Sequence, residues 1–168
     1  MRTVSVKEIE DAVEKLFIKA NYVLPDSVCD AIVRSYEDES DERAAEILKK
    51  LEVNAKTAND GVFPICQDTG MAVIFIEVGN EVFIDGGVLS EAVNRGVARA
   101  YDKGYLRKSV VSEPLFNRVN TGDNTPAVIY TEIVAGDKIK MTAAPKGFGS
   151  ENMSRTKMFT PSAKRGDI

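Results

Sequence analysis

The chain has 168 residues, of which 43% are hydrophobic, and a net charge of −4. This size permits a single domain, and the negative charge disfavours nucleic acid, because phosphate binding requires clustered cations. No apolar run approaches the roughly 20 residues that span a bilayer, and the N-terminus lacks the apolar core of a secretion signal, so we predict a cytoplasmic protein without a membrane partner.

The first sixty residues have the periodicity of helices. Ser5 and Glu8 fit a capping box, which predicts that a helix begins there. Its apolar stripe consists of Val6, Ile9, Val13, Leu16, Phe17 and Ala20. Pro25 suits the first turn of a second helix. A third helix is predicted from Ser40 or Asp41 to about 59–61.

The period then changes to that of strands. We predict strands at 71–78 and 81–84, a helix at 89–102, and strands at 127–134 and 138–144, with 135–137 as a hairpin link between the last two. The order favours an α+β fold, in which a helical N-terminal third precedes mixed β-sheet elements with packed helices. We expect one domain over 1–168 that is truncated at its C-terminus.

The reactive groups of the chain are few. It contains two cysteines, Cys29 and Cys66, and no histidine. This excludes a Ser-His-Asp or Cys-His unit and a four-ligand zinc site within the chain. Cys66 lies in a polar loop that ends at Gly70. The residue pattern alone favours neither a reactive or metal-bound thiol nor an ordinary loop cysteine at this position. Cys29 lies in an apolar helical stripe and reads as a small hydrophobe.

Four segments together resemble a known family, the alpha part of class I, iron–sulfur-dependent fumarate hydratases and of two-subunit tartrate dehydratases. They follow the family's order and approximate spacing, and the first and third are the most specific. These segments are 64–70 (PICQDTG), 106–109 (LRKS), 118–126 (RVNTGDNTP) and 146–152 (KGFGSEN).

The resemblance implies a [4Fe–4S] cluster in the complete enzyme and reversible hydration of a small dicarboxylic acid, with fumarate preferred and tartrate as the alternative substrate. Cys66 would be one of three cluster thiolates, and Gln67 and Asp68 would face the substrate or the open iron. Arg107 would bind a substrate carboxylate, and Gly149 would let backbone N–H groups approach one. The general base is not identifiable and would lie on a partner, a β subunit or C-terminal domain, in an oligomeric assembly.

Two departures from the family pattern keep other readings open. Phe148 stands where the family's loop has its middle glycine, and two further cluster cysteines lie beyond this chain, so the cluster is expected to be absent from the chain alone. A non-catalytic assembly or metal-sensing module is therefore an alternative, which a native stop codon after Ile168 would favour. A thiol enzyme is a third reading, and it requires that alkylation at neutral pH prefer Cys66 over Cys29.

Overall fold

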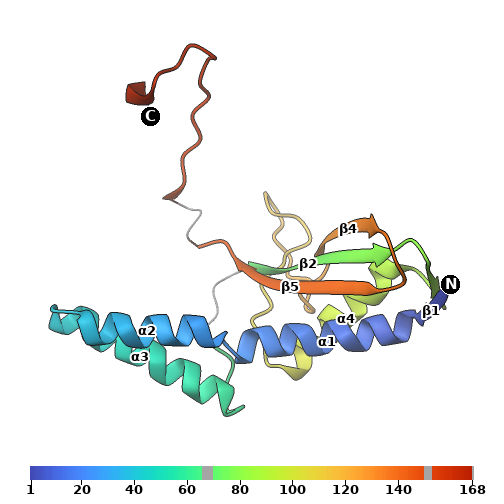
Figure 1. The fold of residues 1–168 in the computed structure, drawn as a ribbon, viewed down its shortest axis with the longest axis horizontal. Helices are drawn as coiled ribbons and strands as arrows, with labels where there is room; N and C mark the ends of the chain where they lie inside the picture. The colour runs from blue at the N-terminus through green and yellow to red at the C-terminus, as the bar shows by residue number, and fades with distance from the viewer. Residues whose placement is uncertain (66–69, 150–152, 168) are drawn as a thin grey trace.

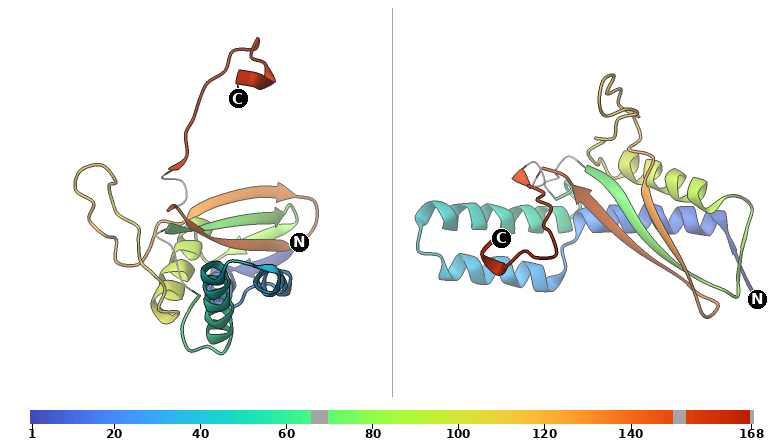
Figure 2. Two further views of the ribbon diagram at one scale, coloured as in Figure 1. Left: turned by 90° about the vertical axis from the view of Figure 1, so that its left-hand side faces the viewer. Right: turned by 90° about the horizontal axis from the view of Figure 1, so that it is seen from above.

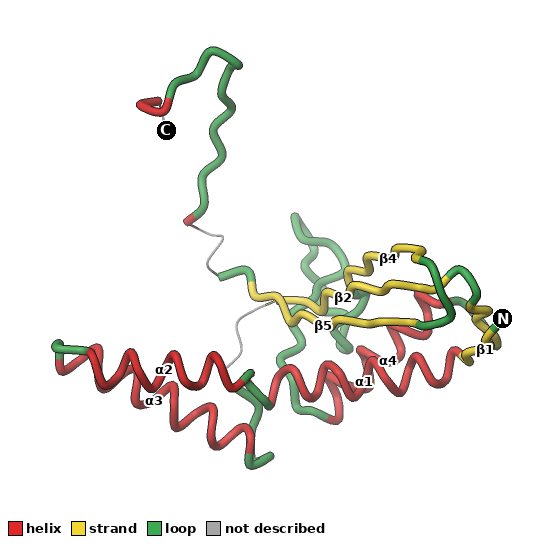
Figure 3. The backbone as a smooth tube through the Cα atoms, viewed as in Figure 1, coloured by secondary structure: helices red, strands yellow, loops and turns green. Residues whose placement is uncertain are grey.

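The computed structural model describes residues 1–65, 70–149 and 153–167, and it confirms the predicted α+β class (Figures 1 and 3). None of the described helices combines the length and apolar character that crossing a membrane requires. The elements, in chain order, are β1 (Arg2–Ser5), α1 (Val6–Tyr22), α2 (Asp26–Asp38), α3 (Glu42–Asn59), β2 (Gly70–Gly79), β3 (Val82–Asp85), α4 (Leu89–Lys103), β4 (Val128–Val134), β5 (Ile139–Gly147) and the short 3₁₀ helix η2 (Arg165–Asp167).

The body of the molecule has two layers, a three-stranded sheet and the pair of helices α1 and α4 on one of its faces (Figure 2). The inward side chains of β2 are fully or almost fully buried against these helices, namely Ala72, Ile74 and Ile76. On the opposite face, Phe75 stacks on Tyr130 of β4 with ring centroids 5.1 Å apart, and both rings are about half exposed. The alternation along β2 thus separates a core face from an open face.

The order of the strands corrects one prediction. We expected β4 and β5 to form a hairpin, but β2 lies between them, parallel to β4 and antiparallel to β5. The link crosses the end of β2, where Gly79 N donates to Lys138 O at 2.8 Å. A side chain at Gly79 would lie 2.3 Å from Gly136 O, so glycine permits the crossing. The hairpin prediction was wrong because a link of a few residues can also cross one intervening strand. Such a crossing covers two inter-strand spacings of about 4.8 Å each.

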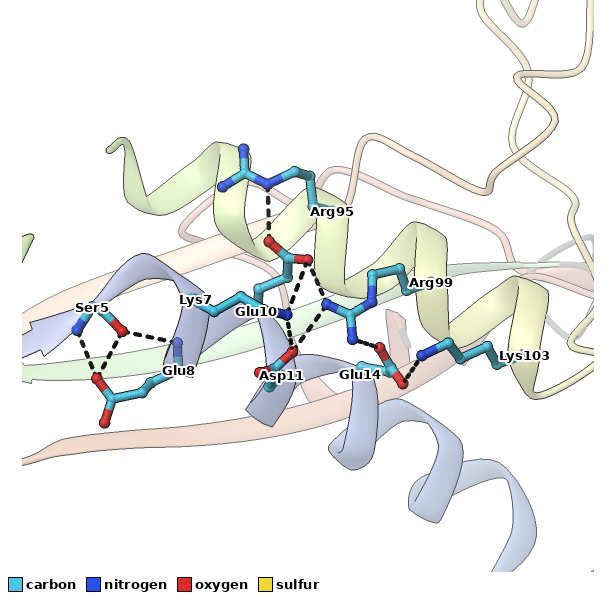
Figure 4. Close-up of polar contacts among 9 residues, drawn as sticks. All are labelled: Ser5, Lys7, Glu8, Glu10, Asp11, Glu14, Arg95, Arg99 and Lys103. Atoms are coloured by element: carbon cyan, nitrogen blue, oxygen red, sulfur yellow. Dashed lines mark hydrogen bonds and ion pairs between the residues drawn. The ribbon is translucent and has the colours of Figure 1, made fainter. Parts of the chain in front are cut away.

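Helices α1 and α4 pack closely because of a glycine and a set of ion pairs (Figure 4). The Cβ of any residue at Gly96 would lie 2.6 Å from Glu10 O, so glycine allows the two backbones to approach. Glu10 then accepts from Arg95 Nε at 3.0 Å and also pairs with Arg99, while Lys103 Nζ lies 2.9 Å from Glu14. The buried residues of α4 include Ala92, Val93, Gly96, Val97 and Ala100.

The ends of α1 and α3 also follow the predictions. Ser5 and Glu8 form the capping box: Glu8 N donates to Ser5 Oγ at 3.2 Å and Ser5 N donates to the Glu8 carboxylate at 2.8 Å. Asp41 caps α3 through its carboxylate. Helices α2 and α3 form a hairpin that extends away from the sheet, and this pair contributes one buried residue, Ala58. Strand β1, which pairs in parallel with β3, was not predicted, because four residues at the start of a chain carry no periodic signal.

Candidate functional site

A cavity of about 250 Å³ lies where β2 begins and β5 ends. Ile65 and Gly70, the described residues on either side of 66–69, both line it. The rest of its wall comes from the C-terminal end of α1 and Leu24 beyond it, from Met71 of β2, from Tyr101 and Arg107 at and after the end of α4, and from β5. The lining residues are Ala20, Asn21, Leu24, Ile65, Gly70, Met71, Tyr101, Arg107, Pro145, Lys146 and Gly147.

Two close contacts fix the chain on either side of 66–69. Ile65 N donates to Asn21 O at 2.8 Å, and the buried side chain of Asn21 is itself held by a hydrogen bond from its Nδ2 to Phe17 O. On the other side, Gly70 pairs with Gly147, and a Cβ at Gly70 would lie 1.8 Å from Lys146 O. Only glycine permits this approach of β2 to β5. The close approach of the two strands therefore explains why the motif at 64–70 ends with a glycine.

The backbone around Arg107 is fixed by neighbours on both sides. Leu106 is buried, and its N–H donates to Tyr101 O at 3.0 Å. Beyond Arg107, the buried Asn124 accepts from Ser109 N at 2.6 Å and from Val110 N at 2.9 Å through Oδ1. The backbone that carries Arg107 is thus tied to α4 and to the 118–126 loop.

That loop is organised by its own polar side chains. Asn120 Oδ1 accepts from Gly122 N at 2.7 Å, and Asp123 Oδ1 accepts from Thr125 N at 2.9 Å and from its hydroxyl at 2.7 Å. Burial acts to raise the pKa of Asp123, but the hydrogen bonds from Thr125, together with one from Thr121, outweigh it and the pKa is lowered. These contacts give Asp123 a structural function within the loop.

The charged side chains among the described lining residues of the cavity all have the same sign. Of its described lining residues, Arg107 and Lys146 carry positive charge, and none is a carboxylate. Lys146 Nζ lies 4.8 Å from the centre of the Phe148 ring. Burial raises the pKa of Tyr101, which keeps its hydroxyl protonated, and the Asn124 side chain partly offsets this shift. A cavity of this kind suits a small anion.

The predicted site residues have different outcomes. Cys66, Gln67 and Asp68 lie outside the described residues, so their assignments stay predictions. Arg107 lines the cavity, and its assignment as a substrate contact stays a prediction. Gly149 lies in an exposed turn two residues after Gly147 and is not among the described lining residues, so its role also stays a prediction.

Sequence reasoning missed the other polar groups of the cavity, Asn21, Tyr101 and Lys146. Asn21 and Tyr101 stand near the ends of helices, where a polar residue carries no functional signal. Lys146 is the first residue of the glycine-rich segment 146–152, and its place in that segment could have identified it as a candidate site residue. Cys29, read as structural, lies in a different cavity of about 400 Å³ that is lined by residues from the α1–α2 link, α2 and α3.

The described residues contain no group of three or more His, Cys, Asp or Glu side chains that is arranged to hold a metal ion. Cys29 is the single cysteine among them. A [4Fe–4S] cluster is held by several cysteine thiolates, whereas the whole sequence contains two cysteines. Because Cys29 belongs to the other cavity, the residues of this chain do not by themselves fit such a cluster.

Comparisons with known proteins give a consistent result. A family model described as "Fumarate hydratase (Fumerase)" matches residues 10–168. A Methanocaldococcus jannaschii protein named for an L(+)-tartrate dehydratase alpha subunit is 36% identical over 160 residues, which are 92% of this chain and 56% of that protein. The L(+)-tartrate dehydratase alpha subunit of Escherichia coli strain UTI89 is 31% identical over 164 residues, which are 91% of this chain and 53% of that protein.

The anaerobic class I fumarate hydratase of Escherichia coli K12 is 39% identical over 110 residues, which are 65% of this chain and 19% of that enzyme. The chain thus spans about half the length of the tartrate dehydratase subunits that it matches, and about a fifth of the fumarate hydratase.

Proposed function

This chain belongs to the fumarate hydratase family, and we propose that it is the N-terminal part of the alpha component of a hydro-lyase. The reaction would be the reversible addition of water to the double bond of a small dicarboxylic acid. The observation that carries the proposal is the position of the cationic cavity, whose wall includes Ile65 and Gly70, two residues of the motif at 64–70. We favour fumarate as the substrate and keep tartrate as the alternative, since relatives with both names match the chain.

Within this cavity, we propose that Arg107 binds a substrate carboxylate. A guanidinium suits this role because its planar fork donates to two oxygens at once. Proton removal next to a carboxylate places negative charge on that group, which fixed positive charge stabilises. Gln67 and Asp68 are proposed to contact the substrate from the adjoining segment, and Gly149 to offer a backbone N–H. No general base is assigned among the described residues, and we propose that a partner supplies it.

We further propose that the complete protein holds a [4Fe–4S] cluster with Cys66 as one of its ligands. When bound, such a cluster supplies an iron that acts as a Lewis acid. This chain does not fit the cluster alone, so other ligands must come from outside it. The relatives named alpha subunits support a β subunit as the partner, and a small dicarboxylate as the ligand of the assembly. A cytoplasmic location stays a prediction.

The proposal is tested by a fumarate hydration assay under anaerobic conditions after reconstitution with iron and sulfide. We expect no turnover by the chain alone, and turnover when the remaining alpha sequence and the β component are supplied. Robust turnover by the chain alone would refute the need for a partner. Tartrate dehydration, measured in the same preparation, decides between the two substrates through the ratio of their kcat/KM values.

Two cysteine variants provide a matched pair for this assay. Cys66→Ser in the complete assembly should abolish activity, because it removes a proposed cluster ligand. Cys29→Ser should leave activity near that of the parent protein, because Cys29 lines the other cavity. Equal activity of the two variants would refute Cys66 as a cluster ligand, whereas no turnover by the parent assembly would favour the non-catalytic module.

A further inference from the structure

We propose that the cavity between the α1–α2 link, α2 and α3 is a second ligand site, which binds a small organic cation with an apolar body. The inference goes beyond the proposed function, because it concerns a separate cavity. That cavity has a volume of about 400 Å³, compared with about 250 Å³ for the one at Arg107, and the two share one described lining residue, Leu24. Its volume lies within the range of roughly 300–1,000 Å³ that small-molecule sites occupy.

The cavity lies at the end of the hairpin where α2 begins and α3 ends. Helix α2 has no buried residue and α3 has one, Ala58, so the hairpin has almost no packed interior of its own. The apolar part of the wall comes from all three elements and provides a surface for the apolar body of a ligand. It consists of Val23, Leu24, Ile32, Val33 and Ala55, together with Cys29.

The charged part of the wall is mainly acidic. Among the described lining residues are three carboxylates, Asp26, Glu52 and Asp60, and one cation, Lys56. Glu52 pairs with this cation and, at 3.0 Å, with Lys49 outside the cavity. Neither the Asp26 nor the Asp60 side chain has a hydrogen bond or an ion pair with another described residue. These two carboxylates can therefore receive a cation that enters the cavity.

The ends of the two helices fix the backbone that carries these carboxylates. Asp26 is the first residue of α2, whose first turn includes a hydrogen bond from Cys29 N to Pro25 O at 3.1 Å. Asp60 follows the last residue of α3, and its N–H donates to Lys56 O at 3.0 Å. A helix C-terminus carries partial negative charge, so the end of α3 adds to the attraction of a cation. The positive end of α2 acts against it, but Asp26 offsets that charge.

Three probes that share one apolar ring and differ in charge test the inference: cyclohexylammonium, cyclohexanol and cyclohexanecarboxylate. Their affinities for the 168-residue chain are measured by ¹H–¹⁵N NMR titration at low ionic strength. Cyclohexylammonium should bind at least about threefold more tightly than cyclohexanol, the difference expected of exposed carboxylates, and cyclohexanecarboxylate should bind most weakly. Added salt should reduce the advantage of the ammonium over the alcohol. Equal affinities of the three probes, or no binding of the ammonium, would overturn the inference.

The two carboxylates are tested by the double variant Asp26→Asn/Asp60→Asn, which removes both charges and keeps the size of the side chains. It should bind the ammonium and the alcohol with nearly equal affinity, and it should bind the alcohol as the wild type does. Asp30→Asn/Asp38→Asn is the matched control, because it removes two exposed charges of α2 that lie outside the cavity wall. If the control loses the preference to the same extent, the charge of the whole hairpin attracts the ammonium and the inference fails.

The location of binding is tested by filling the cavity. Ala55→Leu adds three carbon atoms to the wall and should weaken the binding of the ammonium and the alcohol about fivefold or more, because these atoms take the place of part of the ring. Ala31→Leu, at an exposed position of α2 outside the wall, should change neither affinity. The NMR spectrum reports whether each variant is folded, and Val33→Phe replaces Ala55→Leu if that variant does not fold. Unchanged binding in the filled variant would place the probes elsewhere and refute the site.

The complete assembly provides the last test, because a protein partner is the other possible occupant of the cavity. Cyclohexylammonium should bind to the assembly with an affinity close to that for the chain alone. If binding is lost on assembly, a partner covers the cavity and the small-molecule site is refuted. Fumarate turnover in the same preparation is a separate readout, so a failure of this inference leaves the proposed function intact.

Discussion

The body of the molecule and the α2–α3 hairpin are built from similar sequence patterns but have different interiors. Helix α1 buries Val6, Ile9, Val13 and Phe17 against α4 and the sheet, whereas α2 has no buried residue. In α3, Ile47 and Leu51 remain 59% and 46% exposed despite their helical spacing. Periodicity thus identifies the apolar face of a helix, but it does not indicate whether another element covers that face.

The largest effect that separates the two regions should come from truncating an apolar side chain. Phe17→Ala removes a fully buried ring from the core and should cost about 3–5 kcal/mol of unfolding free energy. Leu51→Ala in the hairpin should cost less than about 1 kcal/mol, because its side chain is already about half exposed to water. Urea denaturation followed by circular dichroism measures both. Similar losses would mean that the hairpin has an interior comparable to that of the body.

The same difference explains how much of the fold could be predicted from sequence. The apolar stripe predicted the buried face of α1 correctly, since this helix packs against α4 and the sheet. The strand positions were also predicted, but not their order, because the link between β4 and β5 permits either a hairpin or a crossing over β2. Register and order depend on contacts between distant segments, which local periodicity does not contain.

In the candidate site too, the sequence identifies residues within local motifs but not residues that meet only in the folded chain. Arg107 was predicted through its resemblance to a family segment, and it lines the cavity. Lys146 and Asn21 were not predicted, because their importance comes from converging on one cavity from distant parts of the chain. Asn124 lies within a predicted motif, but its function of holding Ser109 and Val110 is visible only in the folded chain.

A loss of stability of intermediate size is expected at the close contact between α1 and α4. Gly96→Ala places a methyl group 2.6 Å from Glu10 O and 2.8 Å from Val13 Cβ, and it should destabilise the protein by about 1–3 kcal/mol. Alanine is the better helix former by about 1 kcal/mol, so a loss of stability is a direct sign of the close contact. Ser35→Ala, at an exposed position of α2, should be neutral or slightly stabilising. A more stable Gly96→Ala variant would show that the two helices can separate without cost.

The smallest effect concerns the ion pairs between α1 and α4, and it depends on pH. Hydrogen bonds from Arg99 and Arg95 hold the pKa of Glu10 below its usual value of 4.5. The folded state therefore binds fewer protons at this group than the unfolded state does, so the stabilisation is fully present above about pH 4.5 and is lost as the pH falls through the lowered pKa. Glu10→Gln should cost about 1 kcal/mol or less at neutral pH, because the site is near the surface.

The pH dependence distinguishes this contribution from simple packing. The difference in thermal stability between wild type and Glu10→Gln should shrink as the pH is lowered below 4, because the wild-type carboxylate is then protonated as well. Glu46→Gln in α3 removes an exposed pair with Lys50 and should leave the melting temperature almost unchanged at every pH. If the Glu10→Gln difference stays constant with pH, the carboxylate contributes through shape and not through charge. The contact between α1 and α4 would then owe its stability to the close approach at Gly96 and to the apolar residues around it.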